Sequence, residues 1–173
     1  MGSEMCIRDS IVRIASKTPN IKYVIIGSVP NKLSMRYFIK IRNMISKMNL
    51  KNVILMPNIP FEGKIKVLSK AKVYLHAMIN EHFGISIVEG MAAGLVPVIH
   101  MSGGPWEDIL GKKQGIHGYA FRSIDEAAEY VRDLVFDEEL RGEIIKNNLD
   151  YVQKFSSKMF KEKIVKIVEV FLK

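Results

Sequence analysis

Residues 75–108, LHAMINEHFGISIVEGMAAGLVPVIHMSGGPWED, decide the fold that we expect for this chain. They start in a short apolar strand (residues 73–76), pass through a polar loop into a helix over residues 84–93, and reach Gly94. Glycine is a common stop at the C-terminal end of a helix, and the apolar run 95–99 behind it is typical of a buried strand. A strand, a helix and a strand at this spacing predict a right-handed βαβ unit of a parallel sheet.

The same alternation continues in both directions along the chain. Further strands are expected at residues 23–27, 53–56 and 118–121. Helices are expected from Ile11 to a stop at Pro19-Asn20 and over residues 32–49, 64–71, 105–110, 124–136, 138–155 and 157–172. This order predicts an α/β protein with a doubly wound parallel, Rossmann-like sheet, in which ligands bind beyond the carboxyl ends of the strands. The loops at that edge are residues 27–31, 57–61, 77–83 and 100–105.

The composition fits one folded domain. The chain has 173 residues, of which 48% are hydrophobic and 25% charged, so it can bury one full core. This excludes a disordered chain, a collagen-like repeat and a disulfide scaffold, and the single cysteine, Cys6, cannot form an internal disulfide. No run approaches the ~20 apolar residues that span a bilayer. No secretory signal is visible either, so we expect a cytoplasmic protein.

The net charge of +8 is unevenly distributed. Residues 11–75 carry 13 basic and 1 acidic side chains, whereas residues 76–173 carry 12 basic and 15 acidic ones. A solvated lysine-rich surface, an anionic lipid surface, nucleic acid and a phosphorylated ligand are all compatible with such a basic half. The basic segment 32–51 has Tyr37 and Phe38 but no regular aromatic interleaving, which makes nucleic acid the weaker choice.

Two carboxylates, Glu81 and Glu89, flank the start of the expected helix, which begins near Gly84. The free N–H groups of its first turn are those of Ile85, Ser86 and Ile87. These donors and the positive end of the helix dipole form a phosphate site, while carboxylates accept hydrogen bonds from sugar or ribose hydroxyls. The residues thus indicate a nucleotide sugar. The competing interpretation is that Glu81 only stabilises the helix electrostatically and that Glu89 lies on a solvated face.

The string Glu81-His-Phe-Gly-Ile-Ser-Ile-Val-Glu89, followed by Gly-Met-Ala-Ala-Gly94 and Ser102-Gly-Gly-Pro105, resembles the E-x7-E signature of glycosyltransferase family 4. The members are retaining enzymes of the GT-B architecture, in which the second of two Rossmann-like domains holds most of the donor. Residues 11–173 resemble that C-terminal domain. Asn58-Ile-Pro-Phe, Leu75-His and Asn80-Glu-His-Phe-Gly are closest to the branch of GDP-mannose-dependent α-1,2-mannosyltransferases that extend a dolichol-linked oligosaccharide, and to its archaeal relatives.

The resemblance implies a role for each matching residue. Glu81 is the expected catalytic-site residue, in contact with hydroxyls of the donor sugar, and Glu89 is expected to bind the ribose hydroxyls. The backbone of residues 83–86 is expected to hold sugar and pyrophosphate, through Phe83, Gly84, Ile85 and Ser86. The other expected donor-binding residues are Gly27, Ser28, Asn58, Ile59 and His100, with Asn58 and Ile59 beside the base. A structural hydrogen bond is the competing role for His100.

We expect neither a metal nor any cofactor besides the nucleotide sugar. The chain contains no DxD motif, and its four histidines include no i, i+4 pair. Because Glu81 and Glu89 lie in the acidic half, the excess of basic side chains is expected to be exterior surface, facing solvent or a membrane, rather than the donor site itself.

The resemblance also sets expectations about the extent of the chain. The family has a strand, an Arg and a Lys upstream of the position of Ile11, and a whole acceptor domain before them. We expect residues 1–10 to be a non-native leader, residues 11–173 to be the donor-binding domain and residues 157–173 to pack toward an N-terminal domain. The chain alone is then expected to bind nucleotide at best and not to transfer sugar. Its expected partners are the donor, the acceptor domain and a lipid-linked acceptor at the cytoplasmic face of a membrane.

Two other functions stay open. One is another nucleotide-sugar enzyme of the same fold, such as a glycogen-synthase-like transferase or a non-hydrolysing epimerase. The other belongs to a different class, a basic module that binds a membrane surface or nucleic acid and carries a relic pocket. Nucleotide titration separates these functions, because salt-sensitive binding to vesicles or DNA alone would favour the module.

Overall fold

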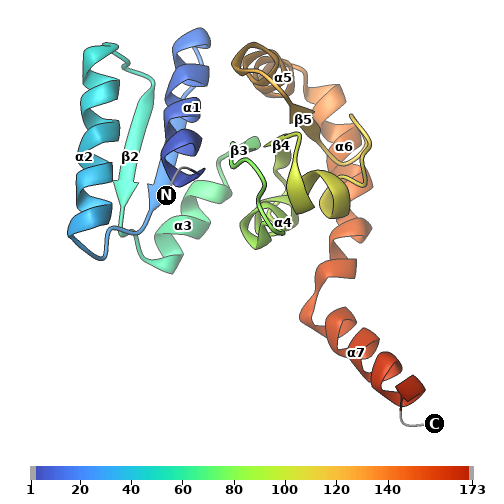
Figure 1. Ribbon diagram of the computed structural model, residues 1–173. Coiled ribbons are helices and arrows are strands. Elements are labelled where there is room, and N and C mark those ends of the chain that lie inside the picture. Colours follow the sequence, from blue (N-terminus) through green and yellow to red (C-terminus); the bar gives the residue numbers. More distant parts are fainter. Residues whose placement is uncertain (1–2, 172–173) are drawn as a thin grey trace.

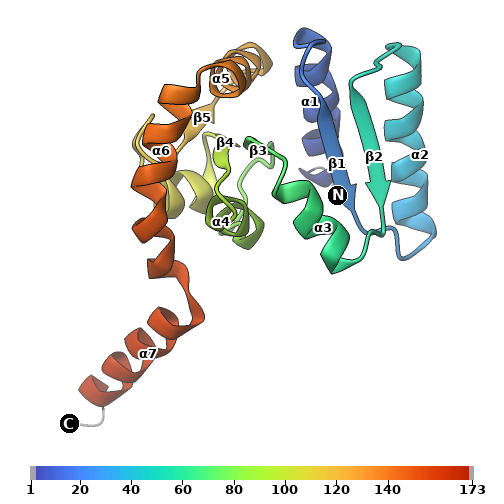
Figure 2. The same ribbon diagram turned by 180° about the vertical axis from the view of Figure 1, so that it is seen from behind.

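The computed structural model describes residues 3–171, with residues 3–8 described by their backbone only. The strands are β1 (Tyr23–Gly27), β2 (Val53–Pro57), β3 (Val73–His76), β4 (Val96–His100) and β5 (Tyr119–Phe121). The helices are α1 (Ser3–Lys17), α2 (Lys32–Lys47), α3 (Phe61–Leu68), α4 (Ile85–Ala92), α5 (Ile124–Phe136), α6 (Glu138–Tyr151) and α7 (Ser157–Phe171), with the short turns η1 (Pro105–Ile109) and η2 (Val152–Phe155). The predicted alternation of strands and helices is confirmed (Figures 1 and 2).

Every strand pair is parallel, as predicted, but the sheet comes in two parts. β1 pairs with β2, from Tyr23 beside Val53 to Gly27 beside Pro57. β4 lies between β3 and β5 in the second part, and among the described residues no ladder joins β1 to β3. Figure 1 shows β2 beside α1 and α2 on one side and the β3–β4–β5 part with α4, α5 and α6 on the other. The predicted Rossmann-like α/β fold is thus confirmed, with its parallel strands in two parts flanked by helices.

Side chains rather than strand pairing connect the two parts. One core cluster contains Ile14 of α1, Tyr23 of β1, Val98 of β4 and Leu134 of α5. A second cluster contains Ile99 of β4 together with residues of α4 and η1. Val98 and Ile99 are both 0% exposed and point into different clusters, because successive side chains of a strand face opposite ways. This explains why the β4 run is continuously apolar.

The N-terminal helix begins earlier than expected. We predicted helical structure only from Ile11, but α1 starts at Ser3, and Asp9 Oδ2 accepts a hydrogen bond from Lys40 Nζ at 2.9 Å. Adding residues to a helix that has already formed costs little free energy. The amphipathic helix that starts at Ile11 therefore extends toward the N-terminus, into residues that have no apolar periodicity of their own. That residues 1–10 are a non-native leader stays a prediction, and residues 1–2 lie outside the described part.

Three further elements differ from expectation. Helix α3 spans Phe61–Leu68, where a helix over residues 64–71 was expected, because it begins directly after Pro60. Residues 105–110 were expected as an ordinary short helix, and the structure has a π-helical turn at Pro105–Ile109. Residues 138–155 were expected as one helix, but α6 ends at Tyr151 and continues as the 3₁₀ turn η2. The Tyr151 hydroxyl donates to Ile109 O at 2.7 Å, which ties these two irregular segments together.

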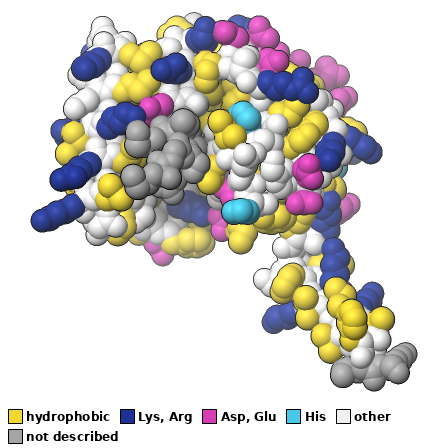
Figure 3. Space-filling model, in the orientation of Figure 1, with side chains coloured by type: hydrophobic (Ala, Val, Ile, Leu, Met, Phe, Trp, Pro, Cys, Tyr) yellow, Lys and Arg dark blue, Asp and Glu magenta, His cyan; other side chains and the backbone are white. Residues whose placement is uncertain are grey.

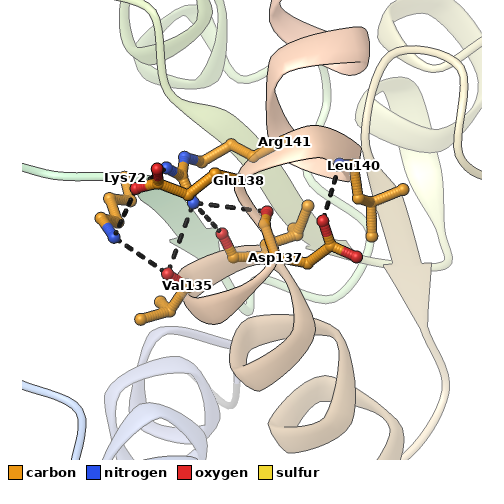
Figure 4. A network of polar contacts seen from close by, with 7 residues as sticks. Lys72, Val135, Asp137, Glu138, Leu140 and Arg141 are labelled. Atoms are coloured by element: carbon orange, nitrogen blue, oxygen red, sulfur yellow. Dashed lines mark hydrogen bonds and ion pairs between the residues drawn. The ribbon is translucent and has the colours of Figure 1, made fainter.

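A polar network fixes the corner between α5 and α6 (Figure 4). Arg141 Nη1 donates to Leu134 O at 2.8 Å, and Lys72 Nζ, from the loop before β3, donates to Val135 O at 3.0 Å. Glu138 lies beside both cations, 3.1 Å from Arg141 Nη2 and 3.7 Å from Lys72 Nζ. The network satisfies carbonyl groups at the end of α5 that have no partner inside the helix, and it anchors the start of β3.

Helix α7 projects away from the rest of the chain (Figures 1 and 2). Its apolar side chains are exposed, among them Phe160, Ile164, Ile167, Val168 and Phe171. The prediction that this segment packs toward another domain stays a prediction, and residues 172–173 lie outside the described part. None of the described helices combines the length and the apolar character needed to cross a membrane.

Candidate functional site

The loop between β3 and α4 holds the Glu81 carboxylate in place. Its Oε1 accepts a hydrogen bond from the backbone N–H of His82 at 2.9 Å. Its Oε2 lies 3.4 Å from Nε2 of His76, the last residue of β3, and the two side chains are only 20% and 17% exposed. Glu81 is therefore a mostly buried carboxylate at the carboxyl end of a strand, directly before α4 begins.

The loop after β4 supports the Glu81 loop through its backbone. The N–H of Gly104 donates to Glu81 O at 2.9 Å, and the N–H of Asn80 donates to Ser102 Oγ at 2.9 Å. A Cβ atom at Gly103 would collide with the carbonyl oxygen of Glu81, and one at Gly104 with that of His82. Only glycine allows the two loops to approach this closely, which explains the Ser-Gly-Gly-Pro sequence.

His100 supports the same loop from the end of β4. Its Nδ1 is hydrogen-bonded to Ser102 Oγ at 2.8 Å, and its ring makes an edge contact with Phe121, with 5.6 Å between the ring centroids. Burial lowers the pKa of His100. The hydrogen bond to Ser102 is the competing structural role considered above, so one ring nitrogen is already occupied within the protein.

The first turn of α4 exposes two backbone donors rather than three. Gly84 precedes the helix with φ 84°, and the N–H groups of Ile85 and Ser86 have no backbone acceptor among the described residues. The expectation of a third free N–H, at Ile87, is wrong, because this group donates to Gly84 O at 2.9 Å. The Phe83 ring packs against Phe155, with centroids 5.6 Å apart, so only its backbone can face a ligand.

Glu89, on the exposed side of α4, forms an ion pair that the sequence did not reveal. Lys64 Nζ of α3 lies 2.6 Å from Glu89 Oε2. One cation of the basic half, Lys64, is thus paired with Glu89. Nearby, burial raises the pKa of Tyr74, while its hydrogen bond with Ser86 and the charge of Lys64 lower it.

The residues expected beside the base form a second group. Gly27 ends β1, and its carbonyl oxygen accepts from the N–H of Asn58 at 3.0 Å. Asn58 Oδ1 accepts from the N–H of Val29 at 2.7 Å, and Asn58 itself has φ 53°. The loops that contain Gly27, Ser28, Asn58 and Ile59 are therefore joined at the carboxyl ends of β1 and β2. The Asn58 side chain is used within the protein, which leaves the backbone and Ile59 to line a ligand.

Helix α3 connects the loops at the ends of β1 and β2 with Glu89 on α4. It begins at Phe61, three residues after Asn58, and its Lys64 reaches Glu89 on α4. Lys64 thus links α3, which follows the Asn58–Ile59 loop, to Glu89 in the middle of α4. Sequence reasoning missed Lys64 and His76 as members of the site. The sequence offers only their positions as signals. Lys64 lies in the first turn of the helix that follows a strand-end loop, and His76 is the last residue of a strand.

The part of the chain that the structure describes contains no group of three His, Cys, Asp or Glu side chains that could hold a metal ion. The expectation that no metal takes part stays a prediction.

The surface charge is divided as the sequence indicates. Figure 3 shows Lys and Arg side chains over the side that carries α1 and α2, while many of the Asp and Glu side chains lie over the other side. Lys64 and its partner Glu89 come from different halves of this distribution.

Burial of His76 makes the stability depend on pH. Burial lowers the pKa of His76 below its ordinary value, and the nearby charge of Glu81 opposes this only in part. As the pH falls through about 6.5, His76 is therefore protonated in the unfolded chain but stays neutral in the folded chain. We expect the free energy of unfolding to fall as the pH decreases from 7.5 toward 5, and to fall less in His76→Gln. Urea unfolding of both proteins across this range checks the prediction, and parallel curves would contradict it.

Comparison with known proteins shows the family of the chain. The family described as "Glycosyl transferases group 1" matches residues 9–150. The chain is 33% identical over 151 residues to "GDP-Man:Man(3)GlcNAc(2)-PP-Dol alpha-1,2-mannosyltransferase" of Dictyostelium discoideum, covering 87% of this chain and 30% of that protein. The human protein of the same name is 33% identical over 164 residues, covering 93% of this chain and 33% of the relative. The chain spans about a third of the length of these curated relatives.

Solved structures show the same fold. A glycosyltransferase from Rickettsia africae superposes with a TM-score of 0.82 at 19% identity, covering 96% of this chain and 44% of that one. The Anabaena protein Alr3699/HepE, solved in complex with UDP-glucose, gives a TM-score of 0.77 at 17% identity, covering 98% of this chain and 45% of that one.

Proposed function

Because the chain belongs to the group 1 glycosyl transferases, we propose that it is the donor-binding domain of a retaining glycosyltransferase that uses a nucleotide sugar, with GDP-mannose favoured. The arrangement around the start of α4 carries this proposal. The N–H groups of Ile85 and Ser86 are free, Glu81 lies before them, and Glu89 follows about 6 Å further along the helix axis. A pyrophosphate at the helix start would have a carboxylate on either side.

Each group has a defined task in the proposed reaction. The N–H groups of α4 and the helix dipole bind the pyrophosphate and stabilise the negative charge that it gains as the bond to the anomeric carbon breaks. Glu81 accepts hydrogen bonds from hydroxyls of the sugar, and Glu89 from those of the ribose. The Asn58–Ile59 loop lines the base. Positioning and charge stabilisation supply most of the rate enhancement, and no metal is needed for either.

The names of the relatives support the choice of donor and acceptor. The proteins at 33% identity are named for GDP-mannose and for an oligosaccharide on dolichol pyrophosphate, whereas the Anabaena structure with UDP-glucose is 17% identical. We therefore propose guanosine diphosphate as the leaving group and a lipid-linked glycan as the acceptor. Such an acceptor would bring the enzyme to the cytoplasmic face of a membrane. An acceptor domain in the remaining length of the relatives is the proposed partner.

Calorimetric titration with GDP, UDP and ADP tests the proposal. We expect saturable binding of GDP, at least about tenfold tighter than that of UDP or ADP, which corresponds to one good hydrogen bond to the base. Tighter binding of UDP would favour another nucleotide-sugar enzyme of the same fold. If no nucleotide binds, and the chain shows only salt-sensitive binding to anionic vesicles or DNA, it is a basic binding module instead.

A further inference from the structure

The imidazole of His76 has an unsatisfied nitrogen beside the proposed sugar site. Among the described residues, Nε2 of His76 is a buried side-chain atom without a hydrogen bond. Its charged neighbour is Oε2 of Glu81, at 3.4 Å. Buried polar atoms almost always have a partner, and an exception at a site calls for an explanation. Both side chains are largely shielded from water, so water does not readily supply the missing partner.

The hydrogen bonds of Glu81 fix its backbone and one carboxylate oxygen, but not the second oxygen. Its backbone is fixed by the N–H of Gly104, and its Oε1 by the N–H of His82. The second of these bonds joins neighbouring residues and leaves the plane of the carboxylate free to turn about it. Oε2 has His76 as its neighbour, so the imidazole is the group that can set the orientation of this oxygen.

We propose that His76 is a positioning residue, whose Nε2–H donates to Oε2 of Glu81 and turns the carboxylate toward the hydroxyls of the donor sugar. This inference rests on the proposed function of Glu81. An ionised carboxylate can accept about four hydrogen bonds. His82 and His76 would use two, which leaves two for the sugar.

A neutral donor suits this task better than a cation. Burial keeps the imidazole neutral by lowering its pKa. A neutral imidazole directs the carboxylate without cancelling its charge, whereas a lysine or arginine would form an ion pair that competes with the sugar hydroxyls. Glu89 provides the contrast, because its carboxylate is paired with Lys64 at 2.6 Å.

The first test needs no ligand. The amide resonance of His82 reports on the hydrogen bond to Glu81 Oε1, and Glu81→Ala gives its position without the carboxylate. We expect His76→Leu, which removes the donor, to shift this resonance measurably toward the Glu81→Ala position, because the carboxylate then turns and the geometry of its bond to the His82 N–H changes. His76→Gln, which keeps an N–H donor, should leave it near the wild-type position. An unchanged His82 resonance in folded His76→Leu would overturn the inference.

The second test compares GDP-mannose with GDP. We expect His76→Leu to weaken binding of GDP-mannose about tenfold, the effect of one hydrogen bond to a charged group, and to change GDP affinity by less than twofold. His76→Gln should restore GDP-mannose affinity. His117→Leu, which removes a partly buried imidazole bonded to Asn148 instead, is the control and should alter neither affinity.

The outcomes separate the two proposals. Equal weakening of both ligands by His76→Leu, or no rescue by glutamine, would show a merely structural role and overturn the inference. If the wild-type chain binds neither GDP nor GDP-mannose, the proposed function fails, and the His82 resonance still decides whether His76 orients Glu81.

Discussion

We expect Glu89→Ala to weaken the binding of GDP by about 10- to 100-fold, because it removes the carboxylate that, in the proposed function, accepts hydrogen bonds from the ribose hydroxyls. Hydrogen bonds to a charged group contribute about 1.5–3 kcal/mol, and each 1.4 kcal/mol is a factor of ten in affinity. The substitution also frees Lys64, whose Nζ lies 2.6 Å from Glu89 Oε2, so the cation can turn toward the phosphates and offset part of the loss. Calorimetric titration with GDP measures the effect.

The structure offers a matched control for Glu89. Asp125 of α5 forms an ion pair of the same length, 2.6 Å, with Lys17 of α1, away from the site. Asp125→Ala removes one negative charge and breaks one surface ion pair, as Glu89→Ala does, but it should leave GDP affinity unchanged. Equal losses in the two variants would show a general charge effect and contradict a ribose contact at Glu89.

The second large effect is expected at Gly104. A Cβ atom there would overlap the carbonyl oxygen of His82, so Gly104→Ala must separate two backbone segments that now touch. We expect the free energy of unfolding to fall by about 1–3 kcal/mol, the usual cost of overpacking. The affinity for GDP-mannose should fall as well, because the bond from Gly104 to Glu81 O holds the loop that carries the carboxylate. Urea unfolding and titration measure the two effects.

Gly142 is the matched control for Gly104. It lies within α6, and a Cβ atom there meets nothing within 4 Å. Alanine is the better helix former by up to about 1 kcal/mol, so Gly142→Ala should be neutral or stabilising. A Gly104→Ala protein as stable as Gly142→Ala would contradict the close approach of the two loops.

The sequence was sufficient to predict the helices and strands and most of the loops at the carboxyl edge of the sheet. The apolar runs at β1, β3 and β4 predict parallel strands, and the structure confirms that all three are strands and run parallel. Of the three, only β4 is buried along most of its length. Because parallel strands all point the same way, the loops that follow them meet at one edge, which predicts that the loops with Gly27, Asn58 and Glu81 lie at the same edge of the sheet. The close packing of Gly103 and Gly104 has a local signal as well, since paired glycines allow backbone segments to touch.

Contacts between distant parts of the chain could not be predicted in this way. Lys64 and Glu89 are 25 residues apart on two helices, and no periodicity within either helix indicates that they meet. The division of the sheet between β1 and β3 depends on which strands are neighbours. The residues of a parallel strand indicate that it is buried in a sheet, but they do not indicate which other strand pairs with it. The N–H of Ile87 is satisfied because the first turn closes onto Gly84, a detail of backbone geometry rather than of residue type.

The most direct test of the account follows the backbone amide resonances while GDP is added. The central claim is that the diphosphate lies at the start of α4, where the N–H groups of Ile85 and Ser86 are free. We expect the Ile85 and Ser86 resonances to shift in proportion to saturation. The Lys64 and Glu89 amides should respond as well, and the exposed basic face of α2 should be unaffected. Saturable GDP binding that leaves Ile85 and Ser86 unmoved, or shifts confined to α2, would contradict it.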